Sequence, residues 1–209
     1  MDALILVDLQ NDFMPGGALA VPEGDEVVPV ANRLMSEFEL VVATADWHPR
    51  NHCSFASNQP GHEIGEVIKV DGLDQILWPD HCIEGTPGAE FHPDLDQSRI
   101  HNIIHKGTKR GIDSYSGFFD NGHVQATGLG DFLKSQGVKR VVILGLATDY
   151  CVKFTALDAL QLGFEIILVR DGCRAVNLQP GDEERAIEEL RFKGAKIANS
   201  NELIDRKRK

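Results

Sequence analysis

The 209-residue sequence lacks any apolar run that approaches the roughly 20 residues needed for a membrane-spanning helix. Its first residues, MDALILVDLQ, have no basic segment and carry Asp2 and Asp8, so no secretory signal peptide is expected. Basic side chains are also in deficit, with 21 Lys and Arg against 32 Asp and Glu and a net charge of −11. This balance argues against nucleic acid or a membrane surface as a partner. The basic run DRKRK at 205–209 is expected to be a solvated end.

Cysteine is scarce as well, and the four cysteines form neither a CxxC pair nor the spacing of a zinc finger. A chain of this length can bury a sizeable core without disulfides, so we expect reduced thiols and a cytoplasmic location. A glycine-rich GxGxxG turn is also missing after the first apolar segment, where DLQNDFMPGG stands instead. Its absence argues against a dinucleotide-binding oxidoreductase.

The chain does contain a regular alternation of β-branched apolar segments with amphipathic ones. This alternation predicts one α/β domain, residues 1–209, with a parallel sheet covered by helices on both faces. The expected strands are Ala3–Leu9, Leu40–Asp46, His101–Gly107, Arg140–Leu146, Phe164–Asp171 and residues 195–199. The expected helices are Glu26–Glu37, Asp131–Gln136, Asp149–Gln161 and the segment 182–193, which Gly194 ends.

One stretch departs from this alternation. The residues between His48 and Arg99 are rich in glycine, proline and histidine and show little regular pattern. A loop of about fifty residues is too long for a plain connection between two strands. We therefore expect this long loop, residues 48–99, to serve the function of the protein.

Three chemically unusual side chains follow three of the expected strands. Asp8 ends the first strand, Lys106 ends the third and Cys151 follows the fourth. Because the carboxyl ends of parallel strands meet at one edge of a sheet, the three side chains are expected to lie together. Asp8 could then accept the thiol proton while Lys106 holds the carboxylate charged. The alternative is a structural Asp8–Lys106 ion pair beside an inert cysteine.

Cys151 is expected in the first turn of a helix. It follows the apolar run KRVVILGL, and Phe154, Leu157 and Leu160 then recur at helical spacing. The unpaired N–H groups and the dipole of a helix N-terminus favour a thiolate. A buried, unreactive cysteine is the alternative for this segment taken alone.

The segment DWHPRNH contains a candidate metal site. Asp46 and His48 are two residues apart in an extended segment, so their side chains point the same way, and His81 in the long loop could supply a third ligand. Three protein ligands with open positions describe a catalytic metal site. The rival ligands nearby are His52, Cys53 and Cys82. The remaining histidines are expected to be solvent-facing or packing residues: His62, His92, His101, His105 and His123.

Taken together, these segments resemble the nicotinamidases, a branch of the isochorismatase-like cysteine hydrolases. The matching pieces are LILVDLQNDFMPGGALAV, TADWHPRNHCSFA, WPDHC, HKGTKRGIDSYSGFFDN and GLATDYCVKFTALDA, and they occur in the order of the family. They span Leu4–Ala159, which is most of the chain.

The resemblance implies a three-layer α/β/α fold with a six-stranded, mainly parallel sheet of Rossmann type. It implies a catalytic triad of Asp8, Lys106 and Cys151, and a divalent metal ion held by Asp46, His48 and His81 with waters. Zinc is favoured, with iron(II) or manganese as alternatives. The resemblance also implies a cis peptide bond between Leu146 and Ala147, with the N–H groups of Ala147 and Cys151 forming an oxyanion hole. The implied substrate-binding residues are Phe13, Leu19, Trp78, Leu146 and Tyr150.

Two positions depart from the family pattern. Some members carry a further histidine ligand where this chain has Ser54, so water or a serine contact is expected to complete the metal shell. Tyr150 stands where other members have histidine, which changes the polarity of the pocket.

The function expected from the resemblance is hydrolysis of nicotinamide to nicotinic acid and ammonia through a thioester, with pyrazinamide as a further substrate. An amidase of another small amide would use the same triad and is the alternative within the superfamily. An isochorismatase proper is disfavoured, because its vinyl-ether cleavage needs no nucleophilic cysteine. A non-catalytic binding module also stays open, since a fold alone does not establish activity. The oligomeric state is open too, with a homo-oligomer as one option.

Overall fold

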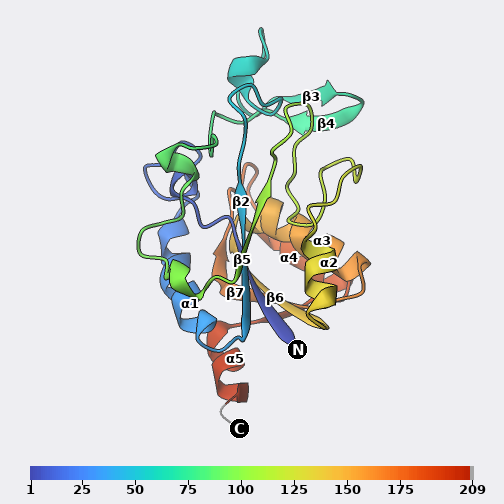
Figure 1. Cartoon of the computed structure of the whole chain (residues 1–209). Coiled ribbons are helices and arrows are strands. Elements are labelled where there is room, and N and C mark those ends of the chain that lie inside the picture. Colours follow the sequence, from blue (N-terminus) through green and yellow to red (C-terminus); the bar gives the residue numbers. More distant parts are fainter. Residues whose placement is uncertain (208–209) are drawn as a thin grey trace.

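Six parallel strands form the central sheet, in the order β5-β2-β1-β6-β7-β8. The computed structural model describes residues 1–207 (Figure 1). The strands are β1 (Asp2–Val7), β2 (Leu40–Asp46), β5 (Asn102–Lys106), β6 (Arg140–Leu146), β7 (Glu165–Arg174) and β8 (Lys196–Ala198). Each expected strand is confirmed: the bounds of β2 and β6 are as expected, and those of the others differ by at most three residues.

Two helical layers cover the sheet. In Figure 1 helices α1 (Val27–Met35) and α5 (Ser200–Lys207) lie on one face, while α2 (Leu129–Ser135), α3 (Lys153–Gln161) and α4 (Asp182–Phe192) lie on the other. Helix α1 illustrates why such helices pack on the sheet. Its buried residues Val27, Ala31 and Leu34 recur at intervals of three and four, which gives the helix one apolar face. The expected three-layer α/β/α fold is therefore confirmed.

The register of the sheet decides which residues meet at its carboxyl edge. Val7 at the end of β1 pairs with Thr44 on one side and with Gly145 on the other. Asp46 at the end of β2 pairs with Lys106 at the end of β5. Because all the strands are parallel, the residues that follow them gather at this edge.

The long loop is more regular than the sequence pattern predicts. Residues 48–99 contain an antiparallel hairpin of β3 (Val67–Val70) and β4 (Leu73–Ile76), together with three short 3₁₀ turns. Figure 1 shows the hairpin beyond the carboxyl ends of the sheet strands. The expectation of little regular structure was wrong, because Asp71 and Gly72 adopt the positive φ angles of a tight two-residue turn.

One helix also begins differently from expectation. The helix expected at Asp149–Gln161 begins with a π-helical turn, Thr148–Val152, and becomes α-helical only at Lys153. Helix α5 continues into the basic end through residue 207, residues 208–209 lie outside the described part, and the solvated end at 205–209 stays an expectation.

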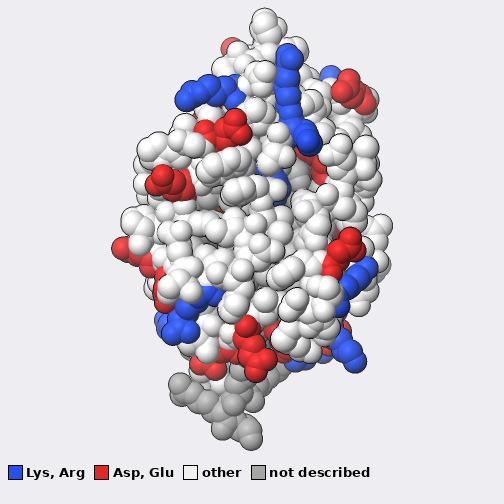
Figure 2. Space-filling view, viewed as in Figure 1, with Lys and Arg blue, Asp and Glu red and all other residues white. Residues whose placement is uncertain are grey.

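The surface mixes charges of both signs. On the face shown in Figure 2, acidic and basic side chains are interspersed, and the centre of this face carries few of either. Among the described residues, no helix has the length and apolar character needed to cross a membrane.

Candidate active site

The three side chains expected to meet at the carboxyl edge lie in contact there. Lys106 Nζ is 2.9 Å from Asp8 Oδ2 and 3.2 Å from Cys151 Sγ. Lys106 also donates a hydrogen bond to the carbonyl oxygen of Ser114, at 2.9 Å. All three side chains are buried. A base, a cation and a thiol are therefore within reach of one another in a place largely shielded from water.

Asp8 is held in place by the neighbouring strand. Its φ angle is positive, and its backbone N–H donates to the carbonyl oxygen of Thr44. The Thr44 hydroxyl donates to Asp8 Oδ1 at 2.6 Å. Oδ1 is occupied in this way, Oδ2 faces Lys106, and the Asp8 carboxylate is within reach of the Cys151 thiol.

The electrostatics of this cluster favour a carboxylate that can take a proton. Burial raises the pKa of Asp8 to about 6, against the attraction of the Lys106 ammonium. Burial disfavours the ammonium too, but the carboxylates of Asp46 and Asp8 outweigh it and raise the pKa of Lys106 well above its usual value. Lys106 therefore stays charged, while Asp8 can exchange a proton near neutral pH.

The thiolate expected at Cys151 is not supported by its surroundings. Burial raises the pKa of Cys151 well above its usual value, and the opposing attraction of Lys106 does not overcome it. The residue lies in the π-helical turn Thr148–Val152 and not in the first turn of an α-helix. Cys151 is therefore a neutral thiol at rest, and it needs a base such as Asp8 to become a nucleophile.

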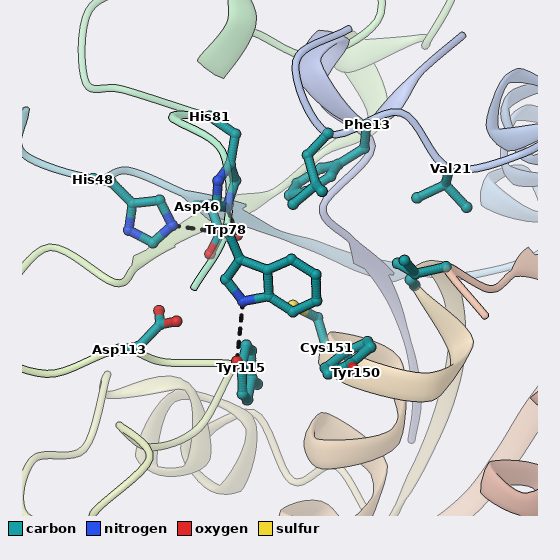
Figure 3. A pocket seen from close by; sticks show the side chains of 13 residues that line it. Phe13, Val21, Asp46, His48, Trp78, His81, Asp113, Tyr115, Tyr150 and Cys151 are labelled. Carbon is teal, nitrogen blue, oxygen red and sulfur yellow. Dashed lines mark hydrogen bonds and ion pairs between the residues drawn. The ribbon is translucent and has the colours of Figure 1, made fainter. Parts of the chain in front are cut away.

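A second cluster adjoins the first. Asp46, His48 and His81 each place a ligand atom within 4.8 Å of the other two, and all three are buried. Asp46 Oδ2 lies 3.6 Å from His48 Nε2 and 3.9 Å from His81 Nε2. One carboxylate oxygen and two imidazole nitrogens therefore face a common point, as Figure 3 shows.

The other nitrogen of each imidazole is fixed by the backbone. His48 Nδ1 lies 2.8 Å from the carbonyl oxygen of Gly107, and His81 Nδ1 lies 2.8 Å from that of Pro79. A carbonyl oxygen requires a proton on Nδ1, which in the neutral ring leaves a lone pair on Nε2. Burial disfavours a charged His48, but the Asp46 carboxylate outweighs burial and raises the pKa of His48, so a bound cation would displace a proton from this ring. Burial lowers the pKa of His81 to about 4, which favours its neutral, ligating form. These residues fit a divalent metal ion with one oxygen and two nitrogen donors.

The rival ligands are engaged elsewhere. Ser54 Oγ lies 2.7 Å from His52 Nδ1, a contact that favours water over the serine as the completion of the metal shell. His52 belongs to a separate candidate ligand cluster with His48 and Asp113, which does not include His81. Among the described residues, neither Cys53 nor Cys82 belongs to a cluster of candidate ligands.

The remaining histidines lie at the surface or pack against aromatic rings, as expected for most of them. His105 stacks on Trp47, with ring centroids 4.6 Å apart. His123 differs, because it makes an ion pair of 3.2 Å with Asp158 as well as stacking on Phe119. The His123–Asp158 pair connects helix α3 with the loop that precedes α2, and neither residue belongs to the two clusters.

A cavity opens on both clusters. Its lining includes Cys151, Asp46, His48 and His81 together with four of the five expected substrate-binding residues, namely Phe13, Leu19, Trp78 and Tyr150. Figure 3 shows the indole of Trp78 beside Cys151 and the metal-ligand cluster, with Phe13 across the cavity. The cavity therefore offers aromatic faces next to a thiol and a candidate metal site.

Leu146 is the expected substrate-binding residue that does not line the cavity. Its side chain is 1% exposed and packs in the core, beside Gly24. The next residue, Ala147, lines the cavity instead, and the peptide bond between the two is cis, as the resemblance implies.

Several lining residues were not expected from the sequence. They are Val21, Asp113, Tyr115 and Val176. The Tyr115 hydroxyl accepts a hydrogen bond from Trp78 Nε1 at 3.1 Å, so it fixes the indole. The motif DSYSGFFDN contains Asp113 and Tyr115, and it was the only sequence signal that could have placed them near the site.

A doubly wound sheet that gathers a thiol, a carboxylate and an ammonium at its carboxyl edge is the arrangement expected of a hydrolase with a cysteine nucleophile. Comparison with known proteins agrees with this class. Residues 2–202 match the model of the isochorismatase domain. The chain is 54% identical to the nicotinamidase of Escherichia coli over 199 residues, which covers 93% of each chain.

Solved structures give the same result. The nicotinamidase/pyrazinamidase of Acinetobacter baumanii matches with a TM-score of 0.94 and 46% identity, covering 97% of each chain. The pyrazinamidase of Pyrococcus horikoshii, solved in complex with zinc, matches with a TM-score of 0.77 and 46% identity, over 95% of this chain and 98% of that one. The chain therefore belongs to the isochorismatase family, in its nicotinamidase branch.

Proposed function

We propose that the chain is a metal-dependent cysteine amidohydrolase that converts nicotinamide to nicotinic acid and ammonia, and that it also hydrolyses pyrazinamide. The observation that carries the proposal is the position of Lys106 Nζ, 2.9 Å from Asp8 Oδ2 and 3.2 Å from the Sγ of Cys151, which lines an aromatic cavity. The relatives named above support nicotinamide as the substrate.

In the first half of the reaction, Asp8 takes the proton of the Cys151 thiol and the sulfur attacks the carboxamide carbon. Lys106 stabilises the negative charge that remains on the cluster. The carbonyl oxygen becomes an oxyanion, which the backbone N–H groups of Ala147 and Cys151 would bind. When the C–N bond breaks, Asp8 returns the proton to the leaving nitrogen, so ammonia departs and a thioester remains.

In the second half, water replaces ammonia in the cavity. Asp8 accepts a proton from the water, and the resulting oxygen attacks the thioester carbon. The same N–H groups bind the second oxyanion. Collapse of this species breaks the C–S bond, and the sulfur recovers its proton from Asp8, so that nicotinic acid and the free thiol are formed.

The rest of the cavity would hold the substrate for these steps. Trp78 and Phe13 offer aromatic surfaces to a pyridine ring. Asp46, His48 and His81 would hold a divalent ion, which would supply a Lewis-acidic position for the ring nitrogen when bound. Zinc is favoured for this position, with iron(II) or manganese as alternatives. Fixing the ring would place the carboxamide against Cys151.

An ammonia-release assay with nicotinamide tests the proposal, with Cys151→Ala as the control for the nucleophile. We expect turnover by the natural chain and its loss in Cys151→Ala, while binding of nicotinic acid persists in that variant. Activity that survives Cys151→Ala would exclude the covalent route. Ammonia release from another small amide but not from nicotinamide would favour the alternative amidase.

The proposal also covers the organisation of the enzyme. The chain would act as one catalytic domain over residues 1–209. The four cysteines are free in the structure, which is consistent with the proposed cytoplasmic location. A homo-oligomer is one option for the enzyme. The mechanism does not depend on this choice, because no step needs residues from a second copy.

A further inference from the structure

The segment between β7 and α4 forms part of the cavity wall. We refer to this segment, residues 175–181, as the strap. Its residue Val176 lines the cavity together with the aromatic residues Trp78 and Tyr115, and it packs against the hydrophobic core. The strap is otherwise exposed over residues 177–180. Its position is therefore set by the contacts that fasten it.

The first fastening is a single carboxylate. Asp149 Oδ1 accepts a hydrogen bond from the N–H of Val176 at 3.0 Å, and Oδ2 accepts one from the N–H of Asn177 at 2.8 Å. Asp149 is only 5% exposed, so these bonds form away from bulk water. Two adjacent backbone donors on one carboxylate hold the start of the strap firmly.

The second fastening lies just beyond the strap, in the first turn of α4. The Thr148 hydroxyl donates to Glu183 Oε1 at 3.1 Å, and Arg170 pairs with the same carboxylate at 2.7 Å. The backbone N–H of Glu183 donates to the side-chain oxygen of Asn177, which connects the two fastenings. Thr148 and Asp149 both belong to the π-helical turn that carries Cys151. One turn therefore places the nucleophile and anchors the part of the wall that carries Val176.

We propose that Asp149 is a positioning residue that fixes Val176 as a wall of the cavity, so that the strap determines which ring sizes the cavity accepts. The inference rests on the proposed function and deepens it. Asp149 does not touch the reacting atoms in this account; it acts through Val176. Loosening the wall leaves the triad in place and gives the bound ring more freedom, which weakens productive binding more than it slows the chemical steps.

The test compares four variants with the natural chain in the ammonia-release assay: Asp149→Ala, Asp149→Asn, Val176→Ala and the Asp149→Ala/Val176→Ala double variant. We expect Asp149→Ala and Val176→Ala each to raise KM for nicotinamide about tenfold with a smaller change in kcat. Asp149→Asn should lie between, because its side-chain oxygen can still accept one of the two N–H groups. KM for a nicotinamide with an added ring methyl should rise less or fall.

The double variant carries the decisive comparison. If Asp149 acts through Val176, KM of the double variant should stay within about threefold of the larger single effect, because the second change removes a wall already lost. If the two effects multiply, Asp149 acts on something else and the inference fails. A fall in kcat with unchanged KM in Asp149→Ala would also overturn it, because that result would assign Asp149 to the placement of Cys151.

Asp171 supplies the matched control. Its carboxylate also accepts two hydrogen bonds, from the backbone N–H and the hydroxyl of Ser200, but it fastens α5, away from the cavity. Asp171→Ala should reduce stability without changing KM.

Hydrogen exchange provides a readout that does not depend on turnover. The amides of 176 and 177 should exchange faster in Asp149→Ala and Asp149→Asn, and not in Asp171→Ala. Unchanged exchange in Asp149→Asn would overturn the inference even if Asp149→Ala failed to fold. If the natural chain releases no ammonia from nicotinamide, the proposed function fails and the inference falls with it. If the natural chain is active and KM of the variants is unchanged, only the inference fails.

Discussion

Lys106 and Asp46 form an ion pair, with Nζ 2.5 Å from Oδ1, and this pair joins the thiol cluster to the metal-ligand cluster. The same ammonium lies 2.9 Å from Asp8. A buried cation thus balances two buried carboxylates, one proposed as a base and the other as a metal ligand. Because Asp46 Oδ1 faces Lys106 while Oδ2 faces the two histidines, each oxygen has a separate partner. The two halves of the site are therefore electrostatically coupled.

Replacing Lys106 by methionine should damage activity and stability together. The variant removes a charge but keeps most of the volume, leaving Asp8 and Asp46 buried without their cation. We expect kcat/KM to fall at least about a thousandfold and the free energy of unfolding to fall by about 3–5 kcal/mol. Urea unfolding and the ammonia assay measure the two effects. Lys69→Met is the matched control, because Lys69 pairs with Asp74 at the exposed surface and such pairs contribute little.

The pH dependence of kcat/KM should reveal the ionisation of Asp8. Its pKa is raised by burial to about 6. A base must be deprotonated to accept the thiol proton, so kcat/KM should fall tenfold for each pH unit below about 6 and level off above it. In Lys106→Met, whatever activity remains should show this fall at higher pH, because the ammonium lowers the pKa of Asp8. The metal content must be measured at each pH, since a fall that follows metal loss would refute this assignment.

The fold could be predicted from the sequence because strands buried on both faces need continuous apolar, β-branched runs. The strands β1, β2 and β6 meet that condition in full, and their bounds are predicted closely. The hairpin of β3 and β4 was missed because its strands are half exposed and only four residues long. The Asp71-Gly72 dipeptide was the signal that could have revealed it, since this pair favours a two-residue turn.

The residues that support the site could not be predicted in the same way. Thr44 bonds to Asp8 because the register of β1 and β2 places them side by side. This register cannot be predicted from the sequence of either strand alone. Asp149 bonds to a strap that lies 27 residues further along the chain. The carboxyl ends of the strands can be located in the sequence, and they predict where the catalytic side chains lie. Polar side chains that bond to backbone groups far along the chain can be identified only in the folded structure. Leu146 was expected to line the pocket, but its side chain packs in the core beside Gly24, and Ala147, after the end of β6, lines the cavity in its place.

Removing the metal should separate two roles for the ion. If it mainly positions the ring, dialysis against a chelator should raise KM strongly and change kcat less. A fall in kcat alone would point to water activation instead. His81→Ala should reproduce the result of the chelator and lower the metal content found by mass spectrometry. His62→Ala should change neither, because His62 lies at the surface and contacts only Glu66 among the charged groups described.

Gln10 should determine how tightly the metal is held, although it is not itself a ligand. Its amide group donates to the carbonyl oxygens of Asp46 and Ala89 and accepts the N–H of Asp46, each at 2.8 Å, and the side chain is fully buried. Gln10→Leu leaves three buried backbone groups unpaired and frees the ligand residue to shift. We expect the metal Kd to rise about tenfold or more and the free energy of unfolding to fall by about 3 kcal/mol.

Competition with a chelating dye and urea unfolding measure these two effects of Gln10→Leu. Gln59→Leu is the matched control. The side chain of Gln59 also donates to a backbone carbonyl oxygen, that of Cys53, but it has no hydrogen bond to a metal-ligand residue. An unchanged Kd in Gln10→Leu would mean that the fold alone holds Asp46. A Kd raised equally in both variants would mean that lost stability, and not the placement of Asp46, weakens the site. A rise confined to Gln10→Leu assigns the amide its role, because Gln10, unlike Gln59, bonds to both backbone groups of Asp46.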